Sequence, residues 1–316
     1  MSARRDRPLK PTRLRTYSLL SRESKVEVND FAKIPETGRG LAGLIDSLPD
    51  ILAGKDFKEF LALLRTAREK KKPVIFALGA HVIKVGLSPV VIRLLEEGWV
   101  TGLALNGAGI IHDFEIAFCG RTSEDVAVQV KSGALGMARE TGKFLNRAIR
   151  RAAREGSGLG EAVGRMIAQS SFPYKNLSLL AAASRLRLPA TVHVALGTDT
   201  IHFHPGASGE ALGKRSLADF FLFCSLVEKL EGGGAFVNVG SAVILPEVFL
   251  KAVSFVRNRG KRLEHFTTAV FDFIHHYRPD QNVVRRVLGK KGKGFYFIGY
   301  HEIMIPLLAA ALPATC

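Results

Sequence analysis

Short continuous runs of apolar residues recur along the chain and alternate with longer stretches whose apolar residues repeat at helical spacing. The clearest run, at 74–78, reads VIFAL and is closed by Gly79, which is typical of a strand buried on both faces of a parallel sheet. Further candidate strands lie at 100–105, 190–196, 235–239, 268–273 and 294–300. Candidate helices lie at 41–52, 57–68, 88–97, 216–230 and 246–257, with 123–186 largely helical. This alternation predicts an α/β fold, a doubly wound parallel sheet with helices on both faces.

The chain is expected to form one domain preceded by a basic extension. Residues 39–316 are predicted as a single α/β domain, because the 47% share of hydrophobic residues suffices for a core and excludes a disordered chain. Residues 1–38 are predicted as a basic, partly disordered N-terminal arm. The first fifteen residues hold six basic side chains and lack the apolar run of a secretory signal, and an organelle transit peptide is the alternative interpretation.

Cysteine content and hydropathy indicate where in the cell the protein is expected. The three cysteines, Cys119, Cys224 and Cys316, form no CxxC pair and are too few for a disulfide scaffold, which indicates a reducing compartment and favours the cytoplasm. The longest apolar stretch, 303–312, contains Pro306 and is shorter than the ~20 residues that cross a bilayer. We therefore expect no membrane-spanning helix.

The loops that follow the candidate strands are where function is expected, because ligands of doubly wound sheets bind outside the carboxyl ends of the strands. These loops are 79–86, 106–113, 197–213, 240–242, 274–280 and 300–302. Seven of the nine histidines lie in them: His81, His112, His202, His204, His275, His276 and His301. Such a concentration indicates a polar site at one edge of the sheet.

Glycine turns in these loops suit a phosphate ligand. The sequences NGAG at 106–109 and GSA at 240–242 stand at strand-to-helix turns, where glycine lets the backbone approach a phosphate and helix amides favour its charge. Glycines at such turns also serve close packing alone. Nucleotide binding and tight packing are therefore both open interpretations at this point.

The histidines and aspartates allow two interpretations. His202 and His204 would point to the same side of an extended segment and could ligate a metal together with Asp199, Asp272 or the histidines at 275–276. No helical HxxxH or HExxH spacing accompanies them, so hydrogen bonding in a polar cleft is the alternative. Asp113 is expected either to cap a helix or to bind a ribose or an amine.

Basic residues exceed acidic ones by 45 − 29 = 16, which gives a formal charge of +16. The excess gathers in three groups. One is a predicted helical face formed by Arg147, Arg150, Arg151 and Arg154. The others are the segment 257–262 and the lysines Lys290, Lys291 and Lys293. These groups would suit RNA or an acidic protein. No RNP, KH or helix-turn-helix signature accompanies them, so a solvated face or a subunit contact is the alternative.

Several motifs resemble those of one family. The segment LNGAGIIHDFE at 105–115 resembles the segment after the second core strand of prokaryotic deoxyhypusine synthases. LPAT at 188–191 and GTD at 197–199 resemble the family's Ile-Pro strand and Thr-Asp loop. RPD at 278–280 and IPLL at 305–308 resemble two further family motifs, and VGSA at 239–242 stands where the family has a triple-glycine turn. The resemblance covers roughly residues 40 to 312.

The resemblance implies a Rossmann-like sheet, NAD bound at subunit interfaces and a homotetramer. It also implies a chemistry in which NAD oxidises an amine such as spermidine to an imine, and an enzyme lysine carries the aminobutyl group to an acceptor amine. The positions that match NAD contacts, with one further glycine of the same turn, are Ala80, Lys84, Asn106, Gly107, Ala108, Gly109, Asp199, Gly240 and Ser241. Lys84 replaces a small hydroxyl residue and would favour a phosphate or another anion.

The family's lysine is replaced here by Val287, with Lys290 and Lys291 as nearby candidates for its role. The candidate catalytic residues are His112, Asp113, Lys290 and His301; the candidate substrate-binding residues are His202, His204, His276 and Asp280; no residue is assigned to a metal. The sequence thus predicts a deoxyhypusine synthase-like, NAD-dependent transferase of a small amine, distinct from hypusine formation. The alternatives are a metal-dependent hydrolase and a non-catalytic protein that binds an acidic partner or RNA.

Overall fold

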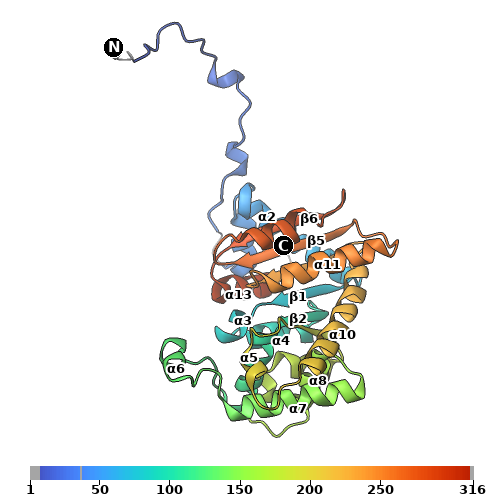
Figure 1. Cartoon of the computed structure of the whole chain (residues 1–316). Helices are drawn as coiled ribbons and strands as arrows, with labels where there is room; N and C mark the ends of the chain where they lie inside the picture. The colour runs from blue at the N-terminus through green and yellow to red at the C-terminus, as the bar shows by residue number, and fades with distance from the viewer. Residues whose placement is uncertain (1–7, 36–37, 314–316) are drawn as a thin grey trace, which may run out of the picture.

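The structure, a computed structural model, describes residues 8–35 and 38–313. Its centre is a sheet of six parallel strands in the order β3-β2-β1-β4-β5-β6 (Figure 1). The strands are β1 Val74–Leu78, β2 Gly102–Asn106, β3 Ala190–His193, β4 Gly234–Val239, β5 Phe266–Asp272 and β6 Lys293–Ile298. This order and the helices around the sheet confirm the predicted doubly wound, Rossmann-like α/β class.

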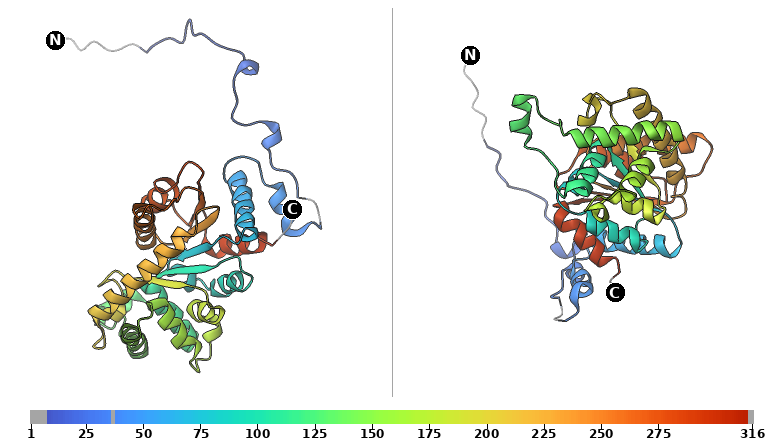
Figure 2. Two further views of the ribbon diagram at one scale, coloured as in Figure 1. Left: turned by 90° about the vertical axis from the view of Figure 1, so that its right-hand side faces the viewer. Right: turned by 90° about the horizontal axis from the view of Figure 1, so that it is seen from below.

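Helices cover both faces of the sheet (Figure 2). The longer ones are α2 Leu52–Glu69, α4 Ser88–Glu96, α5 Gly107–Cys119, α7 Arg139–Glu155, α8 Leu159–Ala168, α10 Gly209–Glu228, α11 Ile244–Asn258 and α13 His301–Ala311. The shorter ones are α1 Gly40–Ser47, α3 His81–Lys84, α6 Val126–Ser132, α9 Leu179–Leu186 and α12 Tyr277–Pro279, with a π-helical turn, η5, at Asp280–Arg285. Four 3-10 turns complete the described elements: η1 Leu19–Ser21, η2 Val28–Asp30, η3 Lys175–Leu177 and η4 Thr200–Phe203.

Strand β1 shows why the runs of apolar residues are continuous. Val74, Phe76 and Leu78 belong to the core cluster under α2, α4, α5, α9 and α13. Ile75 and Ala77 belong to the cluster under α10 and α11 on the other face. Side chains alternate across a strand, so a strand that is covered on both sides must be apolar at every position.

Several boundaries differ from those predicted. Helix α10 begins at Gly209, before the predicted 216, because the Ser208 hydroxyl accepts a hydrogen bond from the Ala211 amide and caps a polar first turn. The predicted helix 41–52 ends at Ser47, since Leu48 precedes Pro49 and is extended. Strand β3 ends at His193, short of the predicted 196.

The described part of the basic arm is exposed along almost its whole length and extends away from the sheet (Figures 1 and 2). It contains the two turns η1 and η2, and its exposed apolar side chains include Leu9, Leu20 and Ile34. Residues 1–7, where the predicted disorder begins, lie outside the described residues. Within the described ranges, every helix is too short or too polar to cross a membrane.

The sheet order creates a switch point between β1 and β4. From β1 the chain proceeds outward through β2 and β3, and it then returns to β4 and proceeds the other way. The turns after the two central strands touch, because a Cβ built on Gly79 would lie 2.1 Å from the Gly240 carbonyl oxygen. Crevices at such switch points are the usual ligand sites of this architecture.

Candidate functional site

Helix α5 begins directly at the end of β2, and its first turn lies at this edge of the sheet. The Asn106 side chain caps the helix by accepting a hydrogen bond from the Gly109 amide at 2.9 Å. A Cβ on Gly107 would lie 1.9 Å from Oδ2 of Asp199, which follows β3. Only glycine therefore lets the Asp199 carboxyl group pack against the start of α5, where helix amides favour negative charge and accept anionic ligands.

Asp199 holds a buried acceptor. Its Oδ2 makes no hydrogen bond with any residue that the structure describes, and the side chain is buried. Burial raises the pKa of Asp199 to about 6. The His202 Nδ1 accepts hydrogen bonds from the amides of Gly197 and Asp199, which turns its Nε2 toward Oδ2 at 3.6 Å. A ligand hydroxyl or ammonium group would supply the missing hydrogen bond to Asp199.

A cavity of about 220 Å³ opens beside Asp199 and the first turn of α5. Its inner wall includes Lys84, Ala108, His112, Glu115, Thr141 and Asp199. Residues of the segment 123–138, which carries α6, form its outer wall, and α6 itself stands away from the body of the molecule (Figure 1). The cavity thus joins an ammonium group, a helix N-terminus, an imidazole and carboxyl groups.

His112 is held in one tautomer by a short relay. The Thr122 hydroxyl donates its proton to Glu115 Oε2 at 2.5 Å, so it accepts from His112 Nδ1 at 2.6 Å. Thr141 donates to the other Glu115 oxygen at 2.9 Å. Burial, and then the positive charge of Lys84, lower the pKa of His112 to about 4. The imidazole is therefore neutral near pH 7, its Nε2 is left as an acceptor, and the residue lines the cavity.

A second polar cluster lies at the ends of β5 and β6. His301 is fully buried, donates from Nε2 to the Phe271 carbonyl at 3.1 Å and lies 4.0 Å from Asp272 Oδ1. His276 approaches the other Asp272 oxygen at 3.8 Å. Burial raises the pKa of Asp272 and lowers the pKa of His301. A Cβ on Gly240 would lie 2.8 Å from the His301 ring, so this imidazole packs against the switch-point turn.

The remaining predicted NAD contacts are spread along the same edge. Ala80 precedes α3 and is half-buried. The Ser241 hydroxyl is buried and accepts a hydrogen bond from the Leu245 amide, so it caps the start of α11. The structure thus brings Lys84, Ala108 and Asp199 into one cavity, while Ser241 belongs to the adjoining turn.

Two predicted catalytic residues lie elsewhere. Asp113 points away from the cavity: its oxygens accept from the Ser178 hydroxyl at 2.6 Å and from two amides at the start of α9. Lys290 lies in the exposed turn before β6, whose first residue pairs with Thr267 near the start of β5. That turn is at the amino-terminal edge of the sheet, opposite the cavity, and we leave both residues out of the site.

The predicted substrate residues also separate. Residues 200–203 form η4, so the predicted extended geometry of the His202-Phe-His204 segment is wrong. His204 instead contacts the Gly136 carbonyl through Nε2 at 2.7 Å. Asp280 is buried at the start of η5, where Arg285 and Gln281 donate to it, and it lies near the second cluster. Among the described residues, no group of three His, Cys, Asp or Glu side chains is arranged to hold a metal ion.

Glu115, Thr122 and Thr141 were missed by sequence reasoning. Glu115 stands three residues after His112 on α5, a spacing that places both side chains on one helical face and that offered a signal for the pair. Thr122 and Thr141 come from a loop and from α7, and only the folded chain brings them to Glu115.

Replacing Asp113 by alanine is expected to lower the free energy of unfolding by roughly 3 kcal/mol, because the Ser178 hydroxyl and two α9 amides would lose a buried acceptor. Urea denaturation measures this loss. The matched control is Asp125→Ala, which removes an exposed cap of α6 and is expected to cost about 1 kcal/mol. Equal losses in the two variants would contradict the structural role of Asp113.

Comparisons with known proteins support the architecture. No family model matches the chain, and no curated protein matches its sequence. Among solved structures, the "putative deoxyhypusine synthase" from Entamoeba histolytica superposes with a TM-score of 0.51 at 11% identity, over 89% of this chain and 95% of that chain.

Two further solved structures belong to longer chains. The apo form of ArgZ, a cyanobacterial arginine dihydrolase, superposes with a TM-score of 0.50 at 15% identity, over 83% of this chain. A mutant of AgrE in complex with L-arginine has a TM-score of 0.50 at 16% identity, over 88% of this chain. This chain spans 33% of each of those proteins. At such identities the likenesses show the fold.

Proposed function

We propose that this chain is an NAD-dependent enzyme that acts on a small amine. The observation that carries the proposal is the cavity at the carboxyl edge of a doubly wound sheet, which is lined by Lys84, by Ala108 in the glycine turn of α5 and by Asp199. The buried Oδ2 of Asp199 accepts no hydrogen bond from the part of the chain that the structure describes. The name of the Entamoeba protein, a putative deoxyhypusine synthase, and the L-arginine bound to AgrE agree with an amine or guanidine substrate.

The residues of the cavity fit the parts of a dinucleotide. Lys84 and the α5 N-terminus would hold a phosphate, because both favour negative charge. Asp199 would accept a hydrogen bond from a ribose hydroxyl, which satisfies a buried oxygen that otherwise accepts no hydrogen bond from the described residues. Gly107 allows Asp199 and the helix backbone to stand this close.

His112 is the proposed proton acceptor. NAD, when bound, supplies the acceptor for a hydride from the carbon beside the amine nitrogen. The amine must also lose a proton, and the neutral His112 Nε2 is the acceptor at the cavity that the relay to Glu115 orients. The relay through Thr122 to the Glu115 carboxylate orients the ring, while burial and Lys84 keep the imidazole neutral and able to take up a proton.

Group transfer to an acceptor amine would extend this oxidation. We place it in the homotetramer that the family resemblance implies and in the cytoplasm that the cysteine content favours. We propose direct transfer without an enzyme-bound intermediate on lysine: the acceptor amine would add to the imine carbon, the original amine would leave, and the hydride would return to the new imine carbon. Val287 is fully buried in the core under α11, and Lys290 lies at the opposite edge of the sheet from the cavity. Because the family's lysine is absent, the proposal does not include hypusine formation.

The activity is tested by incubating the protein with NAD and a panel of amines that includes spermidine, putrescine and arginine, while the absorbance of reduced nicotinamide is followed. Reduction that depends on both protein and amine is expected. The variant His112→Ala should bind NAD like the wild type and lose reduction by at least about 100-fold, the usual contribution of a general base. No reduction with any amine, by a protein that binds NAD, would remove the enzymatic part of the proposal.

A further inference from the structure

Helix α7 divides sharply between an apolar face and a cationic one. Leu145, Ala148, Ile149 and Ala152 are buried against the core. Arg147, Arg150 and Arg154 are exposed, and their spacing of three and four residues places them on one face. The arginines cannot turn inward, because the opposite face of the helix is packed against the body of the protein.

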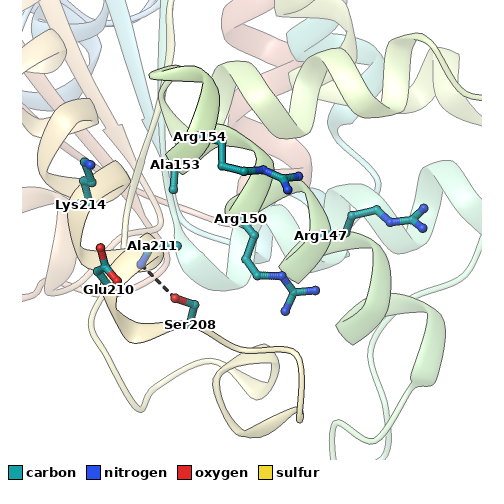
Figure 3. A pocket seen from close by; sticks show the side chains of 8 residues that line it. All are labelled: Arg147, Arg150, Ala153, Arg154, Ser208, Glu210, Ala211 and Lys214. Atoms are coloured by element: carbon teal, nitrogen blue, oxygen red, sulfur yellow. Dashed lines mark hydrogen bonds between the residues drawn. The ribbon is translucent and has the colours of Figure 1, made fainter.

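The three arginines line a cavity of about 540 Å³ between α7 and the start of α10. Figure 3 shows them extending from α7, with Ser208, Glu210 and Lys214 contributed by the other segment. Four cationic side chains thus surround the cavity with one carboxylate, that of Glu210. The N-terminus of the 20-residue helix α10 also lies at this cavity and adds its partial positive charge.

Most of these cations lack a partner in the protein. Arg150 donates to the Gly206 carbonyl. Arg147, Arg154 and Lys214 make no hydrogen bond or ion pair with any other residue of the described ranges, and Glu155 acts on Arg154 only at a distance. Charges gathered in this way repel one another unless an anion lies between them.

The cationic surface continues beyond this cavity. A neighbouring cavity of about 320 Å³ shares Arg150 and adds Arg139 and Lys143. Another of about 210 Å³ shares Arg147 and adds Arg151 and Arg165, both of which are ion-paired with Glu155. Positions 139 and 154 are separated along the helix by roughly 22 Å, which exceeds the size of a single phosphate group and suits a chain of regularly spaced anions.

The lining favours nucleic acid over an acidic protein. The apolar residues of the main cavity are alanines, Ala153 and Ala211, whereas protein interfaces are anchored by buried aromatic or other large side chains. Arginine binds phosphate oxygens in a planar, two-pronged geometry. The main cavity has no aromatic residue in its described lining on which a base would stack.

We propose that the cationic face of α7, formed by Arg139, Lys143, Arg147, Arg150, Arg151 and Arg154 together with Lys214, binds the phosphodiester backbone of a nucleic acid without reading its sequence. This face is distinct from the cavity at the start of α5. Binding of nucleic acid to the α7 face therefore does not depend on the proposed enzymatic function.

Fluorescence anisotropy with labelled single-stranded RNA of about 20 nucleotides, and with DNA of the same sequence, tests the proposal at several salt concentrations. The test variant combines Arg147→Gln, Arg154→Gln and Lys214→Gln and keeps Arg150, which holds the Gly206 loop. The control combines Lys55→Gln, Lys290→Gln and Lys291→Gln, exposed residues that lie outside the α7 face and whose loss changes the net charge equally.

The test variant is expected to bind at least about 10-fold more weakly than the wild type, with a salt dependence shallower by about 2 in the slope of log K against log salt. The control should bind like the wild type, and both variants should show the wild-type circular dichroism spectrum. If the test variant binds both RNA and DNA more weakly than the wild type, recognition of the backbone is supported. If it binds only one of them more weakly, that one is the nucleic acid that the face binds.

Three results would overturn the proposal. One is equal weakening in the test and control variants, which would indicate a general charge effect. Another is a difference of more than about 10-fold between RNAs of unrelated sequence, because backbone contacts carry no sequence information. The last is competition by an oligoglutamate peptide as effective as RNA at equal charge, which would assign the face to an acidic protein.

Discussion

The variant Gly107→Ala is expected to lose NAD binding by at least about 100-fold. The added Cβ would lie 1.9 Å from Asp199 Oδ2, so either the carboxyl group or the first turn of α5 must move. Either displacement separates the helix N-terminus from Asp199, and the phosphate and ribose contacts proposed for the cavity require both. Binding is measured by fluorescence or calorimetric titration of the purified variant with NAD.

The matched control for this substitution is Gly213→Ala. Gly213 lies inside α10, and a Cβ added there meets no atom within 4 Å. Alanine is expected to stabilise the exposed helix by up to about 1 kcal/mol and to leave NAD binding unchanged. If Gly107→Ala binds NAD as tightly as Gly213→Ala, the close approach of Asp199 to α5 has no part in cofactor binding.

The variant Asp199→Asn is expected to raise the stability of the folded protein above about pH 6 and to weaken NAD binding. Burial raises the folded-state pKa of Asp199 from 3.8 to about 6, so the ionised carboxylate destabilises the folded protein. The destabilisation develops as the pH rises from about 4 to about 6 and is complete above that range, where the shift corresponds to roughly 3 kcal/mol. Below about pH 4 the group is neutral in both states and contributes nothing.

An asparagine carries no charge, so Asp199→Asn should unfold at a higher temperature than the wild type above about pH 6 and at a similar temperature near pH 4. The same variant should lose the stabilisation that NAD gives the wild type, since the ribose acceptor is weakened. Thermal unfolding across this pH range, with and without NAD, measures both effects. A constant difference between variant and wild type at every pH would refute the raised pKa as its cause.

The apolar runs contained enough information for the architecture. Each of the six candidate strands became a strand of one parallel sheet. The inner strands are covered on both faces and are buried almost throughout, whereas the edge strand β6 begins and ends with exposed residues. The glycine turn after β2 was also predictable from residues 106–109. Strand order was not, since the return from β3 to β4 depends on how the helices pack between them.

Side-chain direction limited the prediction of the site. His112 and Asp113 are neighbours in the sequence, but successive residues of a helix point about 100° apart, so one lines the cavity and the other caps α9. Lys290 was chosen as a catalytic candidate because it lies near the RPD motif at 278–280 in the sequence. Between the motif and Lys290, however, the chain passes through the π-helical turn η5 and reaches the opposite edge of the sheet. The relay through Thr122 joins residues that no short motif connects.

Isothermal titration calorimetry of the wild-type protein with NAD examines the dinucleotide site without assuming any substrate. We predict saturable binding with one site per chain and a loss of that binding in Gly107→Ala but not in Gly213→Ala. A wild-type protein that remains folded and gives no saturable heat with NAD would contradict the assignment of the Lys84, Gly107 and Asp199 cavity to a dinucleotide.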